Sequence, residues 1–170
     1  MTTELQGPRA RLRTAGRDDR EALAAILADP SVRRWWGETV PADLDAPDDG
    51  DLLVVEVDGA VAGVIQYGEV DDPMYRSASI DIALGAAWQG RGLGREAVAL
   101  LVEHLIEVRG HHRLTIDPAA ANECAIRCYA SVGFRPVGVM RQYERGEDGS
   151  WHDGLLMELL ADEWRAGGAG

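Results

Sequence analysis

The spacing of apolar residues along the chain separates candidate helices from candidate strands. Between Leu93 and Val108 apolar side chains recur every three or four residues, which predicts a long helix over about 92–109. Elsewhere, short apolar runs lie between turn-forming residues, and such runs are typical of strands. They predict strands at 8–14, 51–57, 61–69, 78–84, 112–116, 134–143 and 151–160.

Residues that begin and end helices predict further helical segments. Asp and Pro are common at helix starts, and Gly is common just past helix ends. The predicted segments are 18–29, capped by Asp18 or Asp19, a short helix opened by Pro30 and ended by Gly37, and about 121–132, ended by Gly133. The resulting order, β-αα-β-β-β-α-β-α-β-β, indicates an α/β domain built on one mixed sheet.

The composition is that of a soluble globular protein. The chain has 170 residues, of which 46% are hydrophobic and 27% charged. We expect a single domain over 1–170, with a core at about 8–165 and a frayed C-terminal tail. No apolar run approaches the ~20 residues that span a membrane, and the first residues lack the apolar core of a secretory signal. Two cysteines exclude a disulfide scaffold, so we expect a reduced, cytoplasmic protein.

The charge is strongly acidic and unevenly distributed. Asp and Glu number 29 against 17 basic residues, all of them Arg, which argues against nucleic-acid binding. Eleven of the acids, and no base, lie between Trp36 and Tyr75. Residues 38–50 within this stretch are predicted to form a loop. The acids have two interpretations, a solvated surface loop or a wall that attracts a polycationic ligand.

A glycine-rich turn between a predicted strand and the long helix is the strongest local signal for chemistry. Gln89-Gly90-Arg91-Gly92-Leu93-Gly94 lets the backbone turn sharply and approach a ligand. The free N–H groups of the helix start then form an anion site suited to a pyrophosphate. The segment lacks the dinucleotide fingerprint and, without lysine, is not a Walker loop. The alternative interpretation of the glycines is that they only allow a tight connection between the strand and the helix.

The same segment resembles the Gln/Arg-x-x-Gly-x-Gly/Ala signature of the GCN5-related N-acetyltransferases (GNAT superfamily). A second block, from Asn122 through Tyr129 to Gly133-Phe134, is similar to the family's Asn…Ala…Tyr…Gly-Phe segment. The order of elements agrees from about 8 to 160. The resemblance implies a mixed sheet of about seven strands with a splayed strand pair, about four flanking helices, and acetyl-CoA as cofactor.

The resemblance also implies which residues hold the cofactor. Backbone amides of the glycine loop would bind the pyrophosphate, and N–H groups near Ile82–Leu84 would bind the pantetheine arm and polarise the thioester carbonyl. Tyr129 would protonate the leaving thiolate, unless it is an ordinary core aromatic. The implied cofactor-binding set is Ile82, Ala83, Leu84, Gln89, Gly90, Arg91, Gly92, Leu93, Gly94, Arg95, Asn122 and Tyr129.

Acetyl transfer to an amine requires a general base, because an ammonium group has no lone pair. Asp81 is the best candidate, since it lies mid-strand in Ser79-Ile80-Asp81-Ile82, where an ionised side chain needs a cationic partner. Asp117 is the second candidate, at the carboxyl end of the next strand, where ligands gather in open sheets. The alternatives are an ordinary outward-facing residue for Asp81 and a turn residue before Pro118 for Asp117.

The chain also resembles the aminoglycoside 6′-N-acetyltransferases. The similar segments are Trp35-Trp36-Gly37, Ile80-Asp81, Thr115-Ile116-Asp117-Pro118 and Ala125-Ile126-Arg127-Cys128-Tyr129. In those enzymes the matching aspartates contact amino groups of the antibiotic, and a tryptophan pair lines the sugar site. The resemblance implies a cationic small-molecule amine as substrate and the 6′-amine of an aminoglycoside as acceptor. The expected substrate-binding residues are Trp35, Trp36, Gln66, Tyr67, Asp71, Asp72, Asp81 and Asp117.

The C-terminal stretch leaves the acceptor open. Residues 141–154 resemble acetyltransferases of ribosomal-protein N-termini and of polyamines, which are the alternative acceptors. A catalytically silent domain that binds acyl-CoA is a further alternative, although Asp81 and Tyr129 argue against it. We expect no metal, no nucleic acid and no membrane as partners, and either a monomer or a homodimer.

Overall fold

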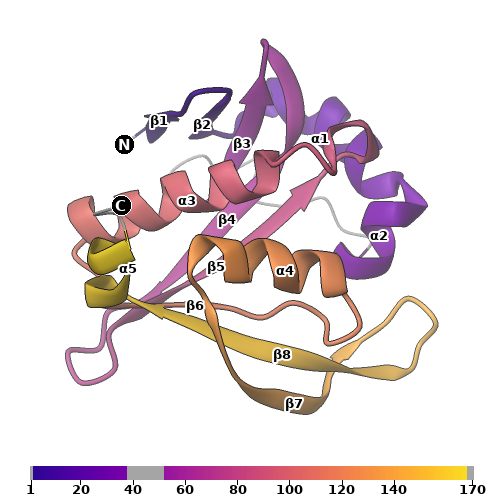
Figure 1. Cartoon of the computed structure of the whole chain (residues 1–170). Coiled ribbons are helices and arrows are strands. Elements are labelled where there is room, and N and C mark those ends of the chain that lie inside the picture. Colours follow the sequence, from indigo (N-terminus) through magenta and orange to yellow (C-terminus); the bar gives the residue numbers. More distant parts are fainter. Residues whose placement is uncertain (1, 38–51, 168–170) are drawn as a thin grey trace. The chain divides into compact units, whose positions relative to one another are not determined.

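The computed structural model describes residues 2–37 and 52–167, and these form an α/β fold (Figure 1). Its mixed sheet has the strand order β1-β2-β3-β4-β5-β6-β8-β7. β5 and β6 are parallel, whereas β6 and β8, and β7 and β8, are antiparallel. The α/β class predicted from the sequence is confirmed. The acidic stretch predicted as a loop at 38–50 lies outside the described residues.

The elements follow the predicted order. The strands are β1 (Glu4–Gln6), β2 (Ala10–Thr14), β3 (Leu52–Val57), β4 (Ala60–Val70), β5 (Ser77–Leu84), β6 (Arg113–Ile116), β7 (Arg135–Arg145) and β8 (Trp151–Leu160). The α-helices are α1 (Arg20–Ala28), α2 (Pro30–Trp36), α3 (Leu93–Glu103), α4 (Glu123–Val132) and α5 (Ala161–Gly167). Short 3-10 turns, η1 (Arg17–Asp19) and η3 (Ala86–Trp88), precede α1 and follow β5.

Three features add detail to the prediction. β1 is only three residues long, and with it the described part of the sheet has eight strands, consistent with the expected number of about seven. α5 follows β8 directly, in a segment for which no helix was predicted. The long helix changes from α to π geometry at η4 (His104–Val108), where the Arg109 N–H donates to the His104 carbonyl at 3.0 Å. Apolar spacing does not distinguish these two helix types.

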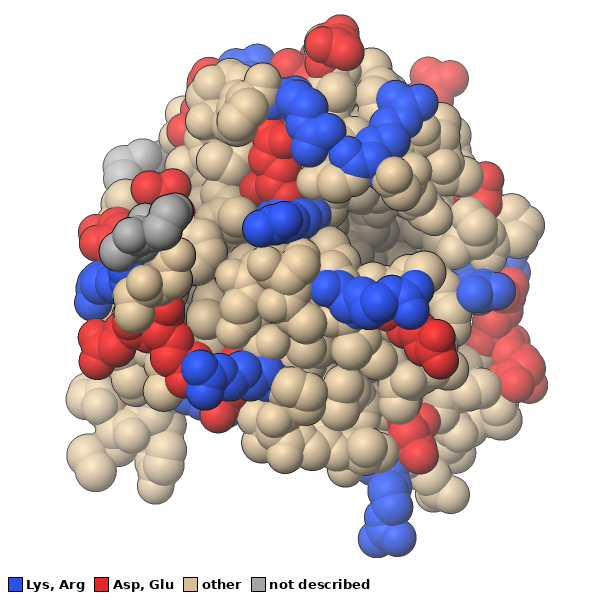
Figure 2. Space-filling view, viewed as in Figure 1, with Lys and Arg blue, Asp and Glu red and all other residues tan. Residues whose placement is uncertain are grey.

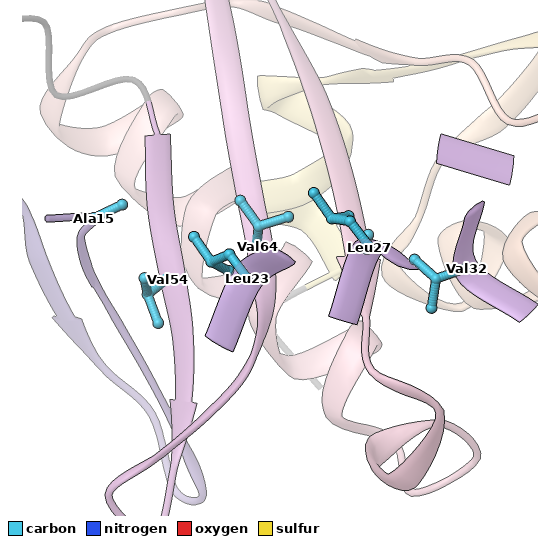
Figure 3. Packing of buried hydrophobic residues seen from close by; sticks show 7 residues of the cluster. Ala15, Leu23, Leu27, Val32, Val54 and Val64 are labelled. Atoms are coloured by element: carbon cyan, nitrogen blue, oxygen red, sulfur yellow. The ribbon is translucent and has the colours of Figure 1, made fainter. Parts of the chain in front are cut away.

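The chain divides into two compact units, Met1–Gln66 with Ile82–Leu100, and Tyr67–Asp81 with Leu101–Gly170. In the first unit α1 presents Leu23 and Leu27, one helical turn apart, to Val54 of β3 and Val64 of β4 (Figure 3). Leu23, Val54 and Val64 are fully buried. This cluster fixes α1 on the strands of the first unit.

The second unit has its own buried residues on β6, β8, α4 and η4. Leu114 of β6 and Met157 of β8 are fully buried, and Leu159 of β8 is almost so. Figure 1 shows α4 alongside these strands. Gly133 ends α4 with φ of +125°, and a Cβ on it would meet the Leu159 side chain at 3.3 Å. The predicted C-cap is therefore confirmed, and it brings the end of α4 onto β8.

A partly buried ionic group joins β4 to the end of η4 in the second unit. Arg109 donates two hydrogen bonds to Glu69, at 2.6 and 3.1 Å, and His111 Nε2 lies 2.6 Å from the same carboxylate. His111 is almost fully buried. The hydrogen bonds from Arg109 lower the pKa of Glu69 to about 2, against the opposing effect of burial. Glu69 is thus held ionised.

We expect this group to stabilise the fold above pH 5 and to lose its effect in acid. The folded pKa of Glu69 is lower than its unfolded value, so its contribution is complete above about pH 5 and disappears as the pH falls towards 2. Glu69→Gln should lower the free energy of unfolding at pH 7 by about 2–3 kcal/mol. Urea unfolding at pH 7, 5 and 3 measures this, with Glu123→Gln on the surface of α4 as control. A difference that stays constant with pH would contradict the assignment.

Candidate active site

The end of β5 in the first unit lies against β4 because residue 63 is glycine. A Cβ on Gly63 would stand 2.2 Å from the Ala83 carbonyl oxygen and 2.9 Å from a methyl group of Leu84. The Gly85 N–H donates to the Ala62 carbonyl at 2.8 Å. Only a residue without a side chain fits at 63. This contact determines where the predicted cofactor-binding segment Ile82–Leu84 runs.

The glycine loop connects this strand end to α3. The Gln89 side chain donates to the Leu84 carbonyl at 2.9 Å, which ties the loop back to the strand. Gly90 and Gly92 have φ values of +73° and +77°, a conformation that favours glycine. The N–H of Glu96 makes a helical bond to the Gly92 carbonyl at 3.2 Å. The N–H groups just before it have no partner within the helix, and the positive end of the helix dipole lies there. This geometry suits an anionic group.

Arg9 and Glu96 brace the loop from the β1–β2 side of the first unit. Arg9 donates to the Arg91 carbonyl at 2.7 Å, and its side chain also pairs with Glu96 at 3.0 Å. Glu96 accepts the backbone N–H groups of Arg9 and Ala10 at 2.7 and 2.8 Å. Burial opposes its charge, but these hydrogen bonds outweigh burial and lower the pKa of Glu96. The loop backbone is thereby fixed by charged groups, which sequence reasoning did not identify.

A cavity of about 460 Å³ adjoins the loop within the first unit. The guanidinium of Arg91 lies over the Trp88 ring, 5.3 Å from its centre. Figure 2 shows basic side chains in the upper part of the view, where Figure 1 draws the start of α3. Guanidinium groups are suited to phosphate groups. The charged and aromatic residues that line the cavity are Arg9, Arg11, Glu56, Asp58, Trp88 and Arg91.

The candidate base and the second aspartate lie in the second unit, on parallel neighbouring strands. Asp81 is an exposed residue of β5, and Asp117 is half-buried just after β6. The register pairs Ile80 with Ile116, where β6 ends, whereas β5 continues to Leu84. Asp81 directly follows Ile80 on β5, and Asp117 directly follows Ile116 at the end of β6. The two aspartates are therefore neighbours at the carboxyl end of β6.

Tyr129 is buried on α4 near both carboxylates. It is 8% exposed. Burial raises the pKa of its phenol well above the usual value, and the charges of Cys128, Asp81 and Asp117 act in the same direction. The phenol therefore keeps its proton at neutral pH and can act as a proton donor. Two carboxylates and one protonated phenol are thus within electrostatic reach of one another.

Asn122, another predicted cofactor residue, has a structural role in the second unit. Its side-chain oxygen accepts the Ala125 N–H at 3.2 Å and so caps α4. The side-chain NH₂ group remains the part that could serve a ligand. Cys124 and Cys128 lie on the same helix, exposed and half-buried respectively.

The predicted substrate-binding residues are divided between the two units. In the first unit, Trp35 and Trp36 are both partly exposed. Trp36 packs against the α1 cluster, whereas Trp35 stacks with Arg34, 4.4 Å from its ring centre. Gln66 of β4 is half-buried in the first unit. Tyr67, the next residue, is buried in the second.

Asp71 and Asp72 lie apart from Asp81 within the second unit. They are exposed in the loop that precedes Ser77, the first residue of β5, whereas Asp81 lies in the half of β5 that ends at Leu84. Asp71 lies 3.7 Å from Arg76, and Asp72 accepts the Met74 N–H at 2.8 Å. Both side chains thus serve the loop itself. Counting acidic residues along the sequence does not show this, because such a count does not tell at which end of a strand each acid lies.

The structure defines an acyltransferase-type domain, in which a glycine-rich loop opens a helix after a strand that carries a candidate base. Comparison with known proteins agrees. Residues 18–134 match the Acetyltransferase (GNAT) family, and the chain belongs to this family. The predicted superfamily and its acetyl-CoA cofactor are confirmed.

Two curated relatives are similar in sequence. Spermidine N(1)-acetyltransferase of Escherichia coli K12 is 26% identical over 166 residues, which cover 92% of this chain and 88% of that protein. The ribosomal protein uS5 alanine N-acetyltransferase of the same organism is 25% identical over 107 residues, 63% of this chain and 55% of that protein. Neither name refers to an aminoglycoside.

A solved structure supports the fold. Spermidine N-acetyltransferase from Vibrio cholerae, in complex with CoA and spermine, superposes with a TM-score of 0.80 at 19% identity. The match covers 94% of this chain and 99% of that chain. At this identity it supports the fold alone.

Within 2–37 and 52–167, no cluster of three His, Cys, Asp or Glu side chains is arranged to hold a metal ion. Among the helices of these same residues, none combines the length and apolar character needed to cross a bilayer.

Proposed function

We propose that the protein transfers the acetyl group of acetyl-CoA to a primary amine of a polycationic small molecule of the polyamine type. The observation that carries this proposal is the pair of carboxylates, Asp81 and Asp117, beside the buried phenol of Tyr129. The relative named for spermidine is similar over nearly the whole chain, which supports the same acceptor class. The net charge of −12 also favours a cationic substrate.

Each residue has a distinct task in this reaction. Acetyl-CoA, when bound, supplies an acetyl group activated as a thioester. The loop amides from Gln89 to Gly94, with Arg91 and Arg95, bind its pyrophosphate, and N–H groups of Ile82–Leu84 stabilise negative charge on the carbonyl oxygen. Asp81 removes a proton from the attacking amine, directly or through water, as the C–N bond forms.

The remaining groups complete the proton balance and hold the acceptor. Tyr129, which is protonated at neutral pH, donates its phenolic proton to sulfur as the C–S bond breaks. The proton taken up by Asp81 replaces it, through solvent. Asp117 binds a second ammonium group of the acceptor, which a polyamine has and a monoamine lacks.

The acceptor is identified by thiol release from acetyl-CoA with a panel of amines. The panel contains spermidine, spermine, kanamycin, neomycin and short peptides with a free N-terminus. We expect release with the polyamines, and mass spectrometry to show one added acetyl group. Release with the peptides alone would favour an N-terminal substrate, and release with kanamycin or neomycin alone would favour the aminoglycoside prediction. Either result would contradict the polyamine proposal while keeping the acetyl-transfer reaction.

A further inference from the structure

The β7–β8 hairpin of the second unit is irregular opposite Asp153. The register passes from Met140↔Gly154 to Glu144↔His152, so residues 141–143 face a single residue of β8. Gln142 in this bulge has φ of +48°, which residues with side chains rarely adopt. Its N–H donates to the Asp153 carboxylate at 2.8 Å. Bulges of this kind redirect side chains and are common next to active sites.

The bulge is fixed to the segment that follows β6. The Ala120 N–H donates to the Asp153 carbonyl at 2.8 Å, and the Leu155 N–H donates to the Pro118 carbonyl at 2.9 Å. These two bonds hold the residues just after Asp117 beside β8. The bulge and Asp117 therefore belong to one hydrogen-bonded arrangement.

Tyr143 is the side chain that the bulge turns towards Asp117. Its hydroxyl donates to Asp117 Oδ2 at 2.5 Å. Its ring lies on the backbone of Gly154, where a Cβ would stand 2.9 Å from a ring carbon. Within the described part of the chain, Tyr143 is the one hydrogen-bond partner of Asp117, so Oδ1 remains available. Glycine at 154 is what allows this approach.

The Tyr143 hydroxyl acts as a hydrogen-bond donor throughout the neutral range. Its bond to the Asp117 carboxylate raises the pKa of Tyr143 to about 12, and the charge of Asp81 acts in the same direction. The phenol therefore keeps its proton on the side of Asp117. One carboxylate oxygen is fixed, and the other is free to meet a ligand.

We propose that Tyr143 is a positioning residue for the acceptor, acting through Asp117 by directing its free oxygen towards an ammonium group of the substrate. This inference rests on the proposed function, because Tyr143 has this task only if Asp117 binds an amine. It also gives a reason for the backbone conformation of Gln142 and for the glycine at 154. The hydroxyl itself touches neither the reacting amine nor the thioester.

Tyr143→Phe tests the inference because it keeps the ring on Gly154 and removes only the hydroxyl. The KM for spermidine should rise about tenfold, since a hydrogen bond to a charged group is lost. The KM for acetyl-CoA and the kcat should stay within about twofold of wild type. Calorimetric titration with spermidine gives a second measure that does not depend on turnover. Tyr75→Phe, at an exposed tyrosine of the β4–β5 loop, is the matched control.

A double-mutant cycle with Asp117→Asn separates positioning from direct contact. If Tyr143 acts through Asp117, Tyr143→Phe should change the KM by less than about twofold in the Asp117→Asn background. The inference would be overturned if Tyr143→Phe had the KM and spermidine affinity of wild type. It would also be overturned if Tyr143→Phe raised the KM by the full tenfold in the Asp117→Asn background. Either result would leave acetyl transfer intact. A wild-type protein that binds and acetylates no amine of the panel would overturn the proposed function and the inference together.

Discussion

Asp81→Asn should lower kcat by about 10²- to 10⁴-fold, the usual contribution of a general base. Asparagine has the same size and cannot accept the proton of the attacking amine. Asp81 is exposed on β5, so the fold should tolerate the change and the melting temperature should stay close to that of wild type. The measurement is steady-state thiol release with spermidine at pH 7.5, together with a thermal melt of each protein.

The pH dependence of the variant distinguishes a base from a residue that only binds substrate. A primary amine with a pKa of about 10 becomes increasingly neutral as the pH rises, so solvent rather than Asp81 then supplies the neutral nucleophile, and hydroxide can take the remaining proton. Activity of Asp81→Asn should therefore recover between pH 7 and 10, more steeply than that of wild type. Asp18→Asn, at an exposed acid of η1, is the matched control. Full activity of a folded Asp81→Asn variant at pH 7.5 would exclude Asp81 as the base.

Most elements of the fold could be predicted from residue patterns. The hairpin turn at Asp58-Gly59, the short helix from Pro30 to Trp36 and the C-cap at Gly133 depend on local backbone chemistry, which a sequence records directly. β1 pairs with the neighbouring β2 and is only three residues long, whereas the π turn of η4 depends on partners distant in the chain. The Arg109 and Gly110 carbonyls at the end of η4, for example, bond to Arg76 of the β4–β5 loop.

The parts of the candidate site that belong to one local sequence motif could be predicted. The contacts between side chains on different strands were much harder to predict. The glycine loop and Tyr129 belong to local segments with recognisable spacing. Tyr143 reaches Asp117 only through a bulge that displaces the strand register, and periodicity gives no sign of such a bulge. The placement of Asp71 and Asp72 away from Asp81 follows from strand direction, which an acid count ignores.

Gly63 lies inside the apolar run Val61-Ala62-Gly63-Val64-Ile65, and a glycine in such a run is a signal of close backbone approach. We expect Gly63→Ala to destabilise the protein by about 2–3 kcal/mol, since the added Cβ overlaps the Ala83 carbonyl oxygen and the strands must separate. Urea unfolding measures this. Gly68→Ala on the same strand is the control, because its Cβ would meet only the Ser79 hydroxyl, at 3.3 Å.

The same substitution should also weaken cofactor binding, and this second effect connects the strand contact to function. If Ile82–Leu84 supply N–H groups to the pantetheine arm, a displaced Ala83 should raise the Kd for CoA by about tenfold or more in protein that remains folded. Calorimetry at a temperature well below the melting transition of the variant separates binding from stability. Normal CoA affinity in a clearly destabilised Gly63→Ala variant would show that Gly63 serves packing alone, and would place the arm elsewhere than along Ile82–Leu84.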